Sequence, residues 1–239
     1  MKRHLPGMLF VFALLLLAGV CVLNYYPLLK LNGVRIVGTE RITTDELGLA
    51  AGDNLFAVDT KGVIDTLLAF PFVAAAAARF DLQGNLIITV TEKEPVCYLY
   101  DGGLYGLSCQ GELLPLEDNG SGSLPVIRGV RLRNSEVYQT VRHTGLNAAL
   151  KLVNLMGRRS PNTLAKTSEI MVTNEGLELI LEPGTVVAKL GWGEYQDKID
   201  MLELVLSDNQ NPALALDLRF KRMAILEKRF SNREVKHGV

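Results

Sequence analysis

"FVAAAAARFDLQGNLIITVTEKEP", residues 72–95, is the stretch that decides the fold of the first folded domain. Its five consecutive alanines favour an α-helix by intrinsic propensity. A helix that began after Pro71 would have only about eight residues before "LQGN", which is too short to be stable alone. The following "NLIITVTEKEP" is rich in β-forming residues, and "QGN" has the chemistry of a hairpin turn. We therefore predict that residues 73–80 form a strand that pairs with 86–92.

The sequence upstream first predicts a short strand and a short helix. "VRIVG" alternates apolar with polar or small residues and stops at Gly38, as a strand does. Thr43 and Glu46 have the spacing of a capping box, which predicts a helix that ends near Gly48 or Gly52.

A second helix is expected in "TKGVIDTLLAF". Asp59 is its candidate N-cap, and Pro71 stops it. Val63, Leu67 and Leu68 would share its buried face. The predicted order of elements is strand, helix, helix, strand, strand, over residues 32–94.

An apolar run from Leu5 to Leu23 precedes this domain. At about 1.5 Å per residue, a helix of this length spans roughly the ~30 Å hydrocarbon core of a bilayer. Lys2 and Arg3 on the near side predict a cytoplasmic amino terminus. We expect one uncleaved transmembrane helix at 5–26, after a cytoplasmic stub at 1–4, with the rest of the chain outside the cytoplasm.

Two alternatives to this anchor concern its far end, "GVC". A cleaved secretory signal remains an alternative, although no clearer small-x-small cleavage site is present. A lipidated Cys21 is disfavoured, because the residue before such a cysteine is small and here it is Val20.

A second, β-rich domain is expected at 95–230, followed by a tail at 231–239. "VCYLYDGGLYGLSCQGELLPL" breaks at its glycines into three short strands, and "LPVIRGV" predicts a fourth. "SEVYQTVRHTGLNAALKLVNLMGR" predicts a long helix, and "SEIMVTNEGLELILEPGTVVAKLGWG" a three-stranded meander. "EYQDKIDMLELVLSD" returns to helical spacing before a last strand. The sequence thus predicts an α+β chain whose second domain is a sheet with flanking helices, one at either side.

Three side chains in this domain have two interpretations each. Cys97 and Cys109 flank "DGG" and are interpreted as two unrelated buried thiols, with a disulfide across the hairpin as the alternative. Trp192 is either an exposed recognition residue or a plug of the core.

The composition and motifs give no indication of catalysis. With 25 basic and 26 acidic side chains, the chain has no electrostatic bias toward nucleic acid. His4, His143 and His237 are far apart, so neither a metal cluster nor a histidine-assisted nucleophile is predicted. His143 is interpreted as a surface residue of a helix. Neither phosphate-loop spacing nor paired CxxC occurs. We expect no enzyme, cofactor, metal or small-molecule substrate, although a carboxylate pair stays open.

The last predicted strand, in "ALALDLRFKRMAILEK", has the clearest alternation in the chain. Apolar residues alternate with small or charged ones, so one face packs and the other is wet. Strict alternation places Phe220 inward with Leu218, and its exposure requires a bend or bulge after Arg219. At the chain end the strand is expected at a sheet edge, where unpaired backbone groups can bind a partner strand. An ordinary closing strand is the alternative.

These elements, in this order, resemble a known family. "VRIVGTERIT", "GDNLFAVD" and the stretch at 72–95 resemble a POTRA domain, and "LPVIRGV", "LGWGEYQDKI" and "LDLRF" follow. Over nearly its whole length the chain resembles the FtsQ/DivIB family of cell-division proteins, although no single motif is specific. Two features depart from the family: few residues precede the anchor, and Phe72 and alanines stand where relatives usually have Trp and charged residues.

The resemblance implies a bitopic, non-catalytic scaffold in the cytoplasmic (inner) membrane at the division septum. It would link early and late division proteins and support septal peptidoglycan synthesis, with FtsB/DivIC-type and FtsL-type partners. It also implies partner binding around "DLRF", with these candidate contacts: Asp217, Arg219, Phe220, Lys221, Met223, Ala224 and Ile225. Two alternatives are a POTRA-bearing secretion or outer-membrane assembly component, which usually has several POTRA repeats or a barrel, and a membrane-anchored envelope hydrolase, which needs convergent polar residues in a cleft.

Overall fold

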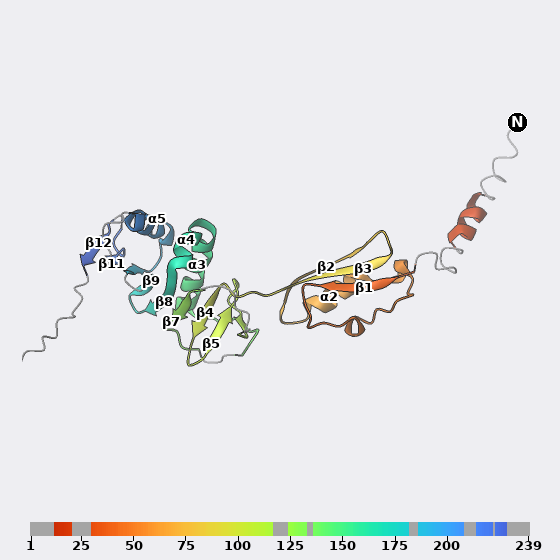
Figure 1. Ribbon diagram of the computed structural model, residues 1–239, viewed down its shortest axis with the longest axis horizontal. Coiled ribbons are helices and arrows are strands. Elements are labelled where there is room, and N and C mark those ends of the chain that lie inside the picture. Colours follow the sequence, from red (N-terminus) through yellow and green to blue (C-terminus); the bar gives the residue numbers. More distant parts are fainter. Residues whose placement is uncertain are drawn as a thin grey trace, which may run out of the picture. The chain divides into compact units, whose positions relative to one another are not determined.

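The chain divides into two compact units, with the division between Lys93 and Glu94 (Figure 1). The computed structural model describes residues 12–20, 30–116, 124–132, 136–181, 186–207, 214–221 and 223–228. Residues 12–20 form a helix with exposed side chains. No helix within these described ranges has the length and apolar character needed to cross a bilayer. Most of the expected anchor at 5–26, the stub at 1–4, Cys21 and the whole tail at 231–239 lie outside the described residues.

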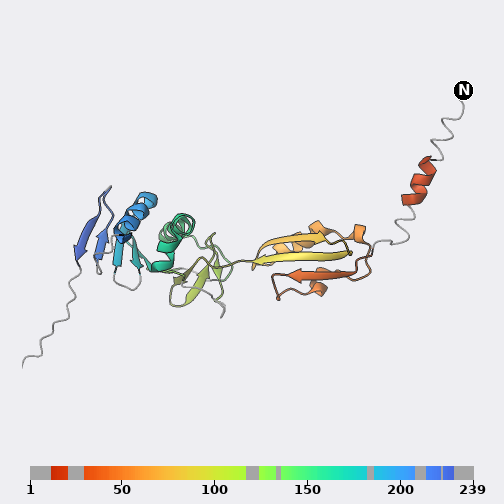
Figure 2. The ribbon, with the colours of Figure 1, turned by 45° about the horizontal axis from the view of Figure 1, so that its top comes forward.

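The first domain is a three-stranded sheet with one α-helix and two short 3-10 helices. Its elements are β1 (Gly33–Val37), η1 (Thr44–Leu47), η2 (Leu55–Ala57), α2 (Thr60–Leu68), β2 (Val73–Phe80) and β3 (Asn85–Glu92). The strand order is β1-β3-β2, with β3 parallel to β1 and antiparallel to β2 (Figure 2). The predicted order of elements is confirmed.

The alanines of β2 are extended, as predicted. Every strand position from Ala75 to Phe80 has a partner on β3, for example Ala77 opposite Thr89. Ala76 and Ala78 pack against the core, whereas Ala77 is exposed. Tertiary pairing therefore overrides the helix propensity of alanine here. The buried core consists of Leu31, Ile42, Val63, Leu67, Val73, Leu86, Ile88 and Val90.

The predicted helix ends of this domain are also present. The Glu46 carboxylate accepts a hydrogen bond from the Thr43 backbone N–H at 3.1 Å, and Gly48 ends η1 with a φ of 62°. The Asp59 carboxylate accepts a hydrogen bond from the Gly62 N–H at 3.0 Å and so caps α2. The prediction that Leu68 is on the buried face is wrong, because its side chain is 48% exposed. Leu68 points about 100° around the helix from its buried neighbour Leu67.

Within the described residues of the second domain, nine strands form one mixed sheet in the order β12-β11-β10-β9-β8-β7-β4-β5-β6. The strands are β4 (Cys97–Tyr100), β5 (Leu104–Leu107), β6 (Leu113–Leu114), β7 (Val126–Arg128), β8 (Thr167–Thr173), β9 (Gly176–Leu181), β10 (Val186–Gly191), β11 (Leu214–Asp217) and β12 (Ile225–Lys228). The helices are α3 (Thr144–Arg159), α4 (Pro161–Lys166) and α5 (Tyr195–Ser207). The predicted meander is β8-β9-β10.

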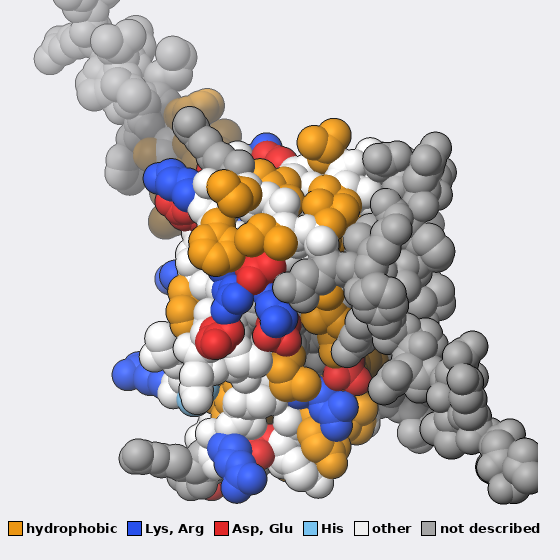
Figure 3. All heavy atoms as spheres, turned by 90° about the vertical axis from the view of Figure 1, so that its left-hand side faces the viewer, with side chains coloured by type: hydrophobic (Ala, Val, Ile, Leu, Met, Phe, Trp, Pro, Cys, Tyr) orange, Lys and Arg blue, Asp and Glu red, His pale blue; other side chains and the backbone are white. Residues whose placement is uncertain are grey.

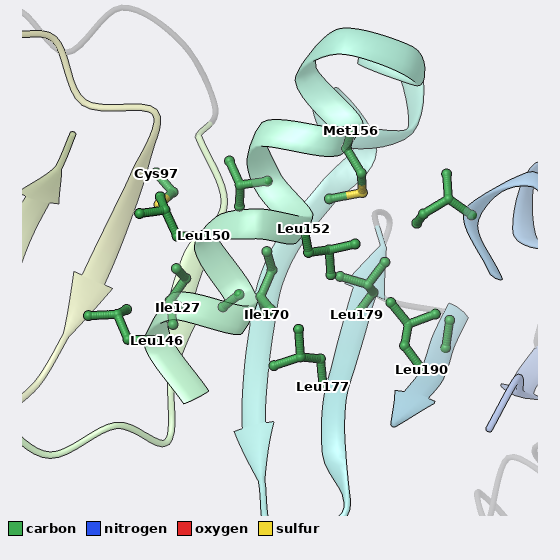
Figure 4. Close-up of a cluster of buried hydrophobic side chains, with 14 of the residues drawn as sticks. Cys97, Ile127, Leu146, Leu150, Leu152, Met156, Ile170, Leu177, Leu179 and Leu190 are labelled. Carbon is green, nitrogen blue, oxygen red and sulfur yellow. The ribbon is translucent and has the colours of Figure 1, made fainter. Parts of the chain in front are cut away.

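The long helices of this domain cover one face of the sheet, so the prediction of a helix at either side is wrong. α3 and α5 contact each other, and both pack on the sheet (Figures 1 and 2). Alternate residues of β9, namely Leu177, Leu179 and Leu181, are buried in the same cluster as α3 residues such as Leu152 and Met156 (Figure 4). Alternate residues of a strand point to the same face of the sheet, so the buried leucines of β9 all lie on one face. α3 and α5 both cover this face.

The helix α3 begins later than predicted. The Tyr138 N–H donates to the Leu113 carbonyl at 2.6 Å, and the Val141 N–H donates to the Gly111 carbonyl at 2.9 Å. This pairing excludes the segment from a helix. His143, predicted on the helix surface, is instead the N-cap, and its Nδ1 accepts a hydrogen bond from the Leu146 N–H at 3.3 Å.

Cys97 and Cys109 are both free, as the preferred interpretation states, but they differ in exposure. Cys97 is buried, and burial raises the pKa of its thiol to about 12. Cys109 is exposed, so the prediction that it is buried is wrong.

Candidate protein-interaction edge

The segment predicted to be one last strand is a hairpin. β11 pairs in parallel with β10, and β12 returns antiparallel to β11 with Ile225 opposite Asp217. The pairing with β10 ends where the Leu218 N–H donates to the Lys189 carbonyl at 2.9 Å, and the chain bends at Phe220. The single-strand prediction is therefore wrong, and the outer strand is β12.

The edge strand β12 combines an open backbone with apolar side chains. Among the described residues it pairs with β11 alone, so its other side is free of pairing. Ile225 is 39% exposed and Leu226 is 47% exposed. Figure 3 views this end of the domain and shows apolar side chains gathered around a group of basic and acidic ones. Such an edge can accept another strand by backbone hydrogen bonding.

Asp217 and Arg219 form a local ion pair. The Arg219 Nε donates to both Asp217 carboxylate oxygens at 2.9 and 3.0 Å, and its guanidinium also pairs with Glu175. These hydrogen bonds hold the pKa of Asp217 below its usual value and raise the pKa of Arg219. Both predicted contact residues are thus engaged within the chain, and their interactions fix the end of β11 against the β8–β9 turn.

Phe220 lies at the bend after Arg219 that its exposure requires. It is 51% exposed, whereas Leu218, two residues earlier, is 1% exposed. Phe220 borders a hollow of about 180 Å³ lined by Glu194, Asp197, Lys198, Met201, Leu218, Phe220 and Lys221. Phe220 is therefore available at the surface rather than part of the core.

The other predicted residues differ in accessibility. Met223 is exposed at 57%, and Lys221 is exposed and pairs with Glu194 at 3.4 Å. Ala224 is partly buried and packs against the core. The hairpin therefore places Phe220, Met223 and Ile225 at the surface, whereas Ala224 is only partly accessible.

The helix α5 adds apolar side chains that the sequence analysis missed. Met201 lines the hollow, and Leu204, which is 72% exposed, follows it at a spacing of three residues on the same helical face. Ile199 and Leu202 occupy the buried stripe. Met201 packs in part against the core, and Leu204 is the exposed apolar residue of this face. Its position outside the buried stripe was the available sequence signal.

Lys198 holds the turn between β10 and α5. Its Nζ donates to the carbonyls of Leu190 at 2.7 Å, Gly193 at 2.9 Å and Trp192 at 3.5 Å. Desolvation lowers the pKa of Lys198, and the nearby Glu194 carboxylate opposes this effect. Trp192 is about half exposed, and its indole N–H donates to the Asn174 carbonyl at 3.3 Å. The core-plug interpretation of Trp192 is wrong.

No group of three or more His, Cys, Asp or Glu side chains in the described part of the chain is arranged to hold a metal ion. The hollow beside Phe220 has charged residues of both signs at its rim. Its apolar lining consists of Met201, Leu218 and Phe220.

Comparison with known proteins agrees with this organisation. The model of the FtsQ-type POTRA domain matches residues 29–93. Similar curated proteins include the Cell division protein FtsQ of Anaeromyxobacter sp. (strain K), 30% identical over 237 residues, which cover 95% of this chain and 77% of that protein. The proteins of the same name from Geobacter sp. (strain M21) and Geotalea daltonii are 28% and 26% identical, over 80% and 77% of this chain and 72% and 69% of theirs. The chain belongs to the FtsQ family of cell-division proteins.

Proposed function

We propose that this protein is a non-catalytic scaffold of the division machinery that binds bitopic partners of the FtsB/DivIC and FtsL types. The complex would link early and late division proteins and support septal peptidoglycan synthesis. The family supports a role in division. The single observation that carries the binding mechanism is the open edge of β12 next to the half-exposed Phe220.

The partner segment would add as an extended strand to β12. Its backbone would pair with the outer side of β12, and its apolar side chains would pack on Phe220, Met223 and the hollow beside α5. Asp217 and Arg219 would set the position of the hairpin and contribute charge at its rim.

The proposed location is the cytoplasmic membrane at the septum, with both folded domains outside the cytoplasm. The segment at 5–26 would be a retained anchor, and the exposed apolar helix at 12–20 is consistent with it. The first domain would support recruitment to the division site. The curated relatives named above are division proteins, so a secretion component is not the preferred function.

The first test is Phe220→Ala in the outer segment, with titration of an FtsB-type partner. We expect affinity to fall about thirtyfold or more, because truncation of a hot-spot aromatic costs at least ~2 kcal/mol. The melting temperature should change little, since half of the side chain is already in solvent. Leu116→Ala is the control, because Leu116 is 50% exposed. A folded Phe220→Ala variant with unchanged affinity would remove Phe220 from the interface.

Strand addition itself is tested by a pair of prolines at Ile225 and Leu226. Successive N–H groups of a strand point to opposite sides, so one of the two variants removes an outward N–H from β12. That variant should lose binding. If both variants stay folded and bind normally, the partner does not pair with this edge.

A further inference from the structure

The turn between β2 and β3 lies beside the first residues of the first domain. The Asn32 backbone N–H donates to the Gly84 carbonyl at 3.0 Å, and its side chain donates to the Gln83 carbonyl. The turn and the start of β1 are therefore at the same end of the sheet, as Figures 1 and 2 show. The chain enters the domain at this end.

The turn exposes apolar side chains. Leu82 is fully exposed at its tip, and Phe80 at the end of β2 is 37% exposed. The Asp81 carboxylate accepts hydrogen bonds from the backbone N–H groups of Gln83 and Asn85, both at 2.8 Å. These hydrogen bonds fix the turn, so Leu82 is held outward on an ordered structure. A leucine in this position is unusual, because turn tips are mostly polar or glycine.

Basic side chains surround the same end. Arg35 on β1 and Arg79 on β2 are both opposite Ile87 of β3, so they lie in one row on one face of the sheet. In the described part of the chain, neither forms an ion pair. Lys30 is also exposed at the domain entrance. The acidic groups at this end, Asp53 and Asp81, both accept backbone hydrogen bonds.

The length of the connection restricts where this end can be. Three residues, 27–29, lie between position 26, the end of the proposed anchor, and Lys30. The four residue steps from 26 to 30 span at most about 14 Å when the chain is fully extended. The domain entrance, and the turn that is hydrogen-bonded to it, are therefore kept close to the bilayer surface. A tethered contact of this kind needs little intrinsic affinity, because the tether supplies a high effective concentration.

We propose that the β2–β3 turn is a second membrane contact of this protein. Leu82 enters the boundary between headgroups and acyl chains of the outer leaflet, and Arg35, Arg79 and Lys30 face lipid phosphates. The contact would restrict the orientation of the first domain relative to the membrane. This inference rests on the anchor in the proposed function, and its partner is the bilayer that holds the anchor.

The test uses the full chain in bilayers of phosphatidylethanolamine and phosphatidylglycerol, without any partner protein. Leu82→Cys is labelled with a small fluorophore, on a background of Cys21→Ser and Cys109→Ser, because Cys97 is buried. Quenching by lipids with a spin label near the headgroup is then measured. The matched control is Glu40→Cys, an exposed position beyond the opposite end of β1. We expect severalfold stronger quenching at 82 than at 40.

A third sample distinguishes a failure of the proposed turn contact from a failure of the proposed anchor. Native Cys21, labelled on the Cys109→Ser background, lies in the proposed anchor and should be quenched. If Cys21 is quenched but positions 82 and 40 are equal, the membrane contact is wrong and the anchor stands. If Cys21 is not quenched, the anchor is wrong and this inference is wrong with it. Arg35→Gln with Arg79→Gln should reduce quenching at 82, and an unchanged signal would remove the arginines from the contact.

Discussion

In the part of the chain that the structure describes, β2 is an edge strand of the first sheet and β12 is an edge strand of the second, and these two edges differ in their side chains. β2 carries alanines along most of its length, and Ala77 is exposed to solvent. β12 carries Ile225 and Leu226, with Phe220 and Met223 nearby. Burial of apolar surface contributes about 25 cal/mol per Å², so an alanine edge offers a partner backbone groups but little apolar area. An open edge alone is therefore a weak indication of binding, and the side chains beside it decide which edge a partner prefers.

The two edge strands can be compared separately only if each belongs to a domain with its own core. Truncation of a core residue tests this, and it has the largest expected effect on stability. Leu86→Ala in β3 should destabilise the first domain by about 2 to 5 kcal/mol, as buried leucine truncations do. Trp192, the single tryptophan, reports on the second domain. Its fluorescence transition in urea should not move, while the loss of circular dichroism should begin earlier.

Leu179→Ala in β9 is the reciprocal variant, because Leu179 is buried in the other core. It should shift the Trp192 transition and leave the first domain unchanged. A shift of the Trp192 transition by Leu86→Ala would show that the two domains unfold together.

A charge placed on each edge tests the difference directly. Leu226→Lys should weaken partner binding at least tenfold, about 1.4 kcal/mol, because a lysine on an edge strand opposes strand pairing. Ala77→Lys should leave binding unchanged, since the β2 edge is not the proposed site. Both are measured by titration of the same partner. Equal losses would place the first domain's edge in the interface as well.

The smallest expected effect concerns the ion pair at the end of β11. The pKa of Asp217 is lowered in the folded chain, first by the hydrogen bond from Arg219. Its contribution is therefore present above the unfolded pKa of about 3.9 and is lost as pH falls through the lower, folded pKa. Asp217→Asn should reduce stability by about 1 kcal/mol or less at pH 7, and the difference from wild type should shrink as the pH falls through the lowered pKa of Asp217 in the folded chain. A constant difference across this range would assign the effect to packing.

The sequence predicted the elements that local chemistry determines. Asp59 and Pro71 defined the ends of α2, and the turn at 81–84 with the β-rich residues after it outweighed the alanine run. The hairpin at the carboxyl end was missed, because the alternation in 214–220 continues through the bend. The bend follows the end of pairing with β10, which is a long-range contact.

The same physical reason explains the errors at the site. The late start of α3 depends on pairing with residues 111–113, and the coverage of one sheet face depends on how α3 meets α5. Phe220 and Met223 lie at the surface, and their contact with a partner stays a prediction. The sequence pattern did not show that Arg219 pairs with Asp217 and Glu175. The exposure of Leu204 was also missed, although its position outside the buried stripe of α5 was an available signal.

Among the residues that the structure describes, β12 pairs with β11 alone, whereas β9 has a strand on both sides. Segments with few buried contacts open at free energies well below that of global unfolding, so the terminal hairpin should be the first part of the second domain to exchange its amide hydrogens. A bound strand would convert β12 from an outer into an inner strand. Proteases that cut transiently opened segments would then remove free copies of this protein faster than assembled ones. The occupancy of a single sheet edge would thus also set the lifetime of the molecule.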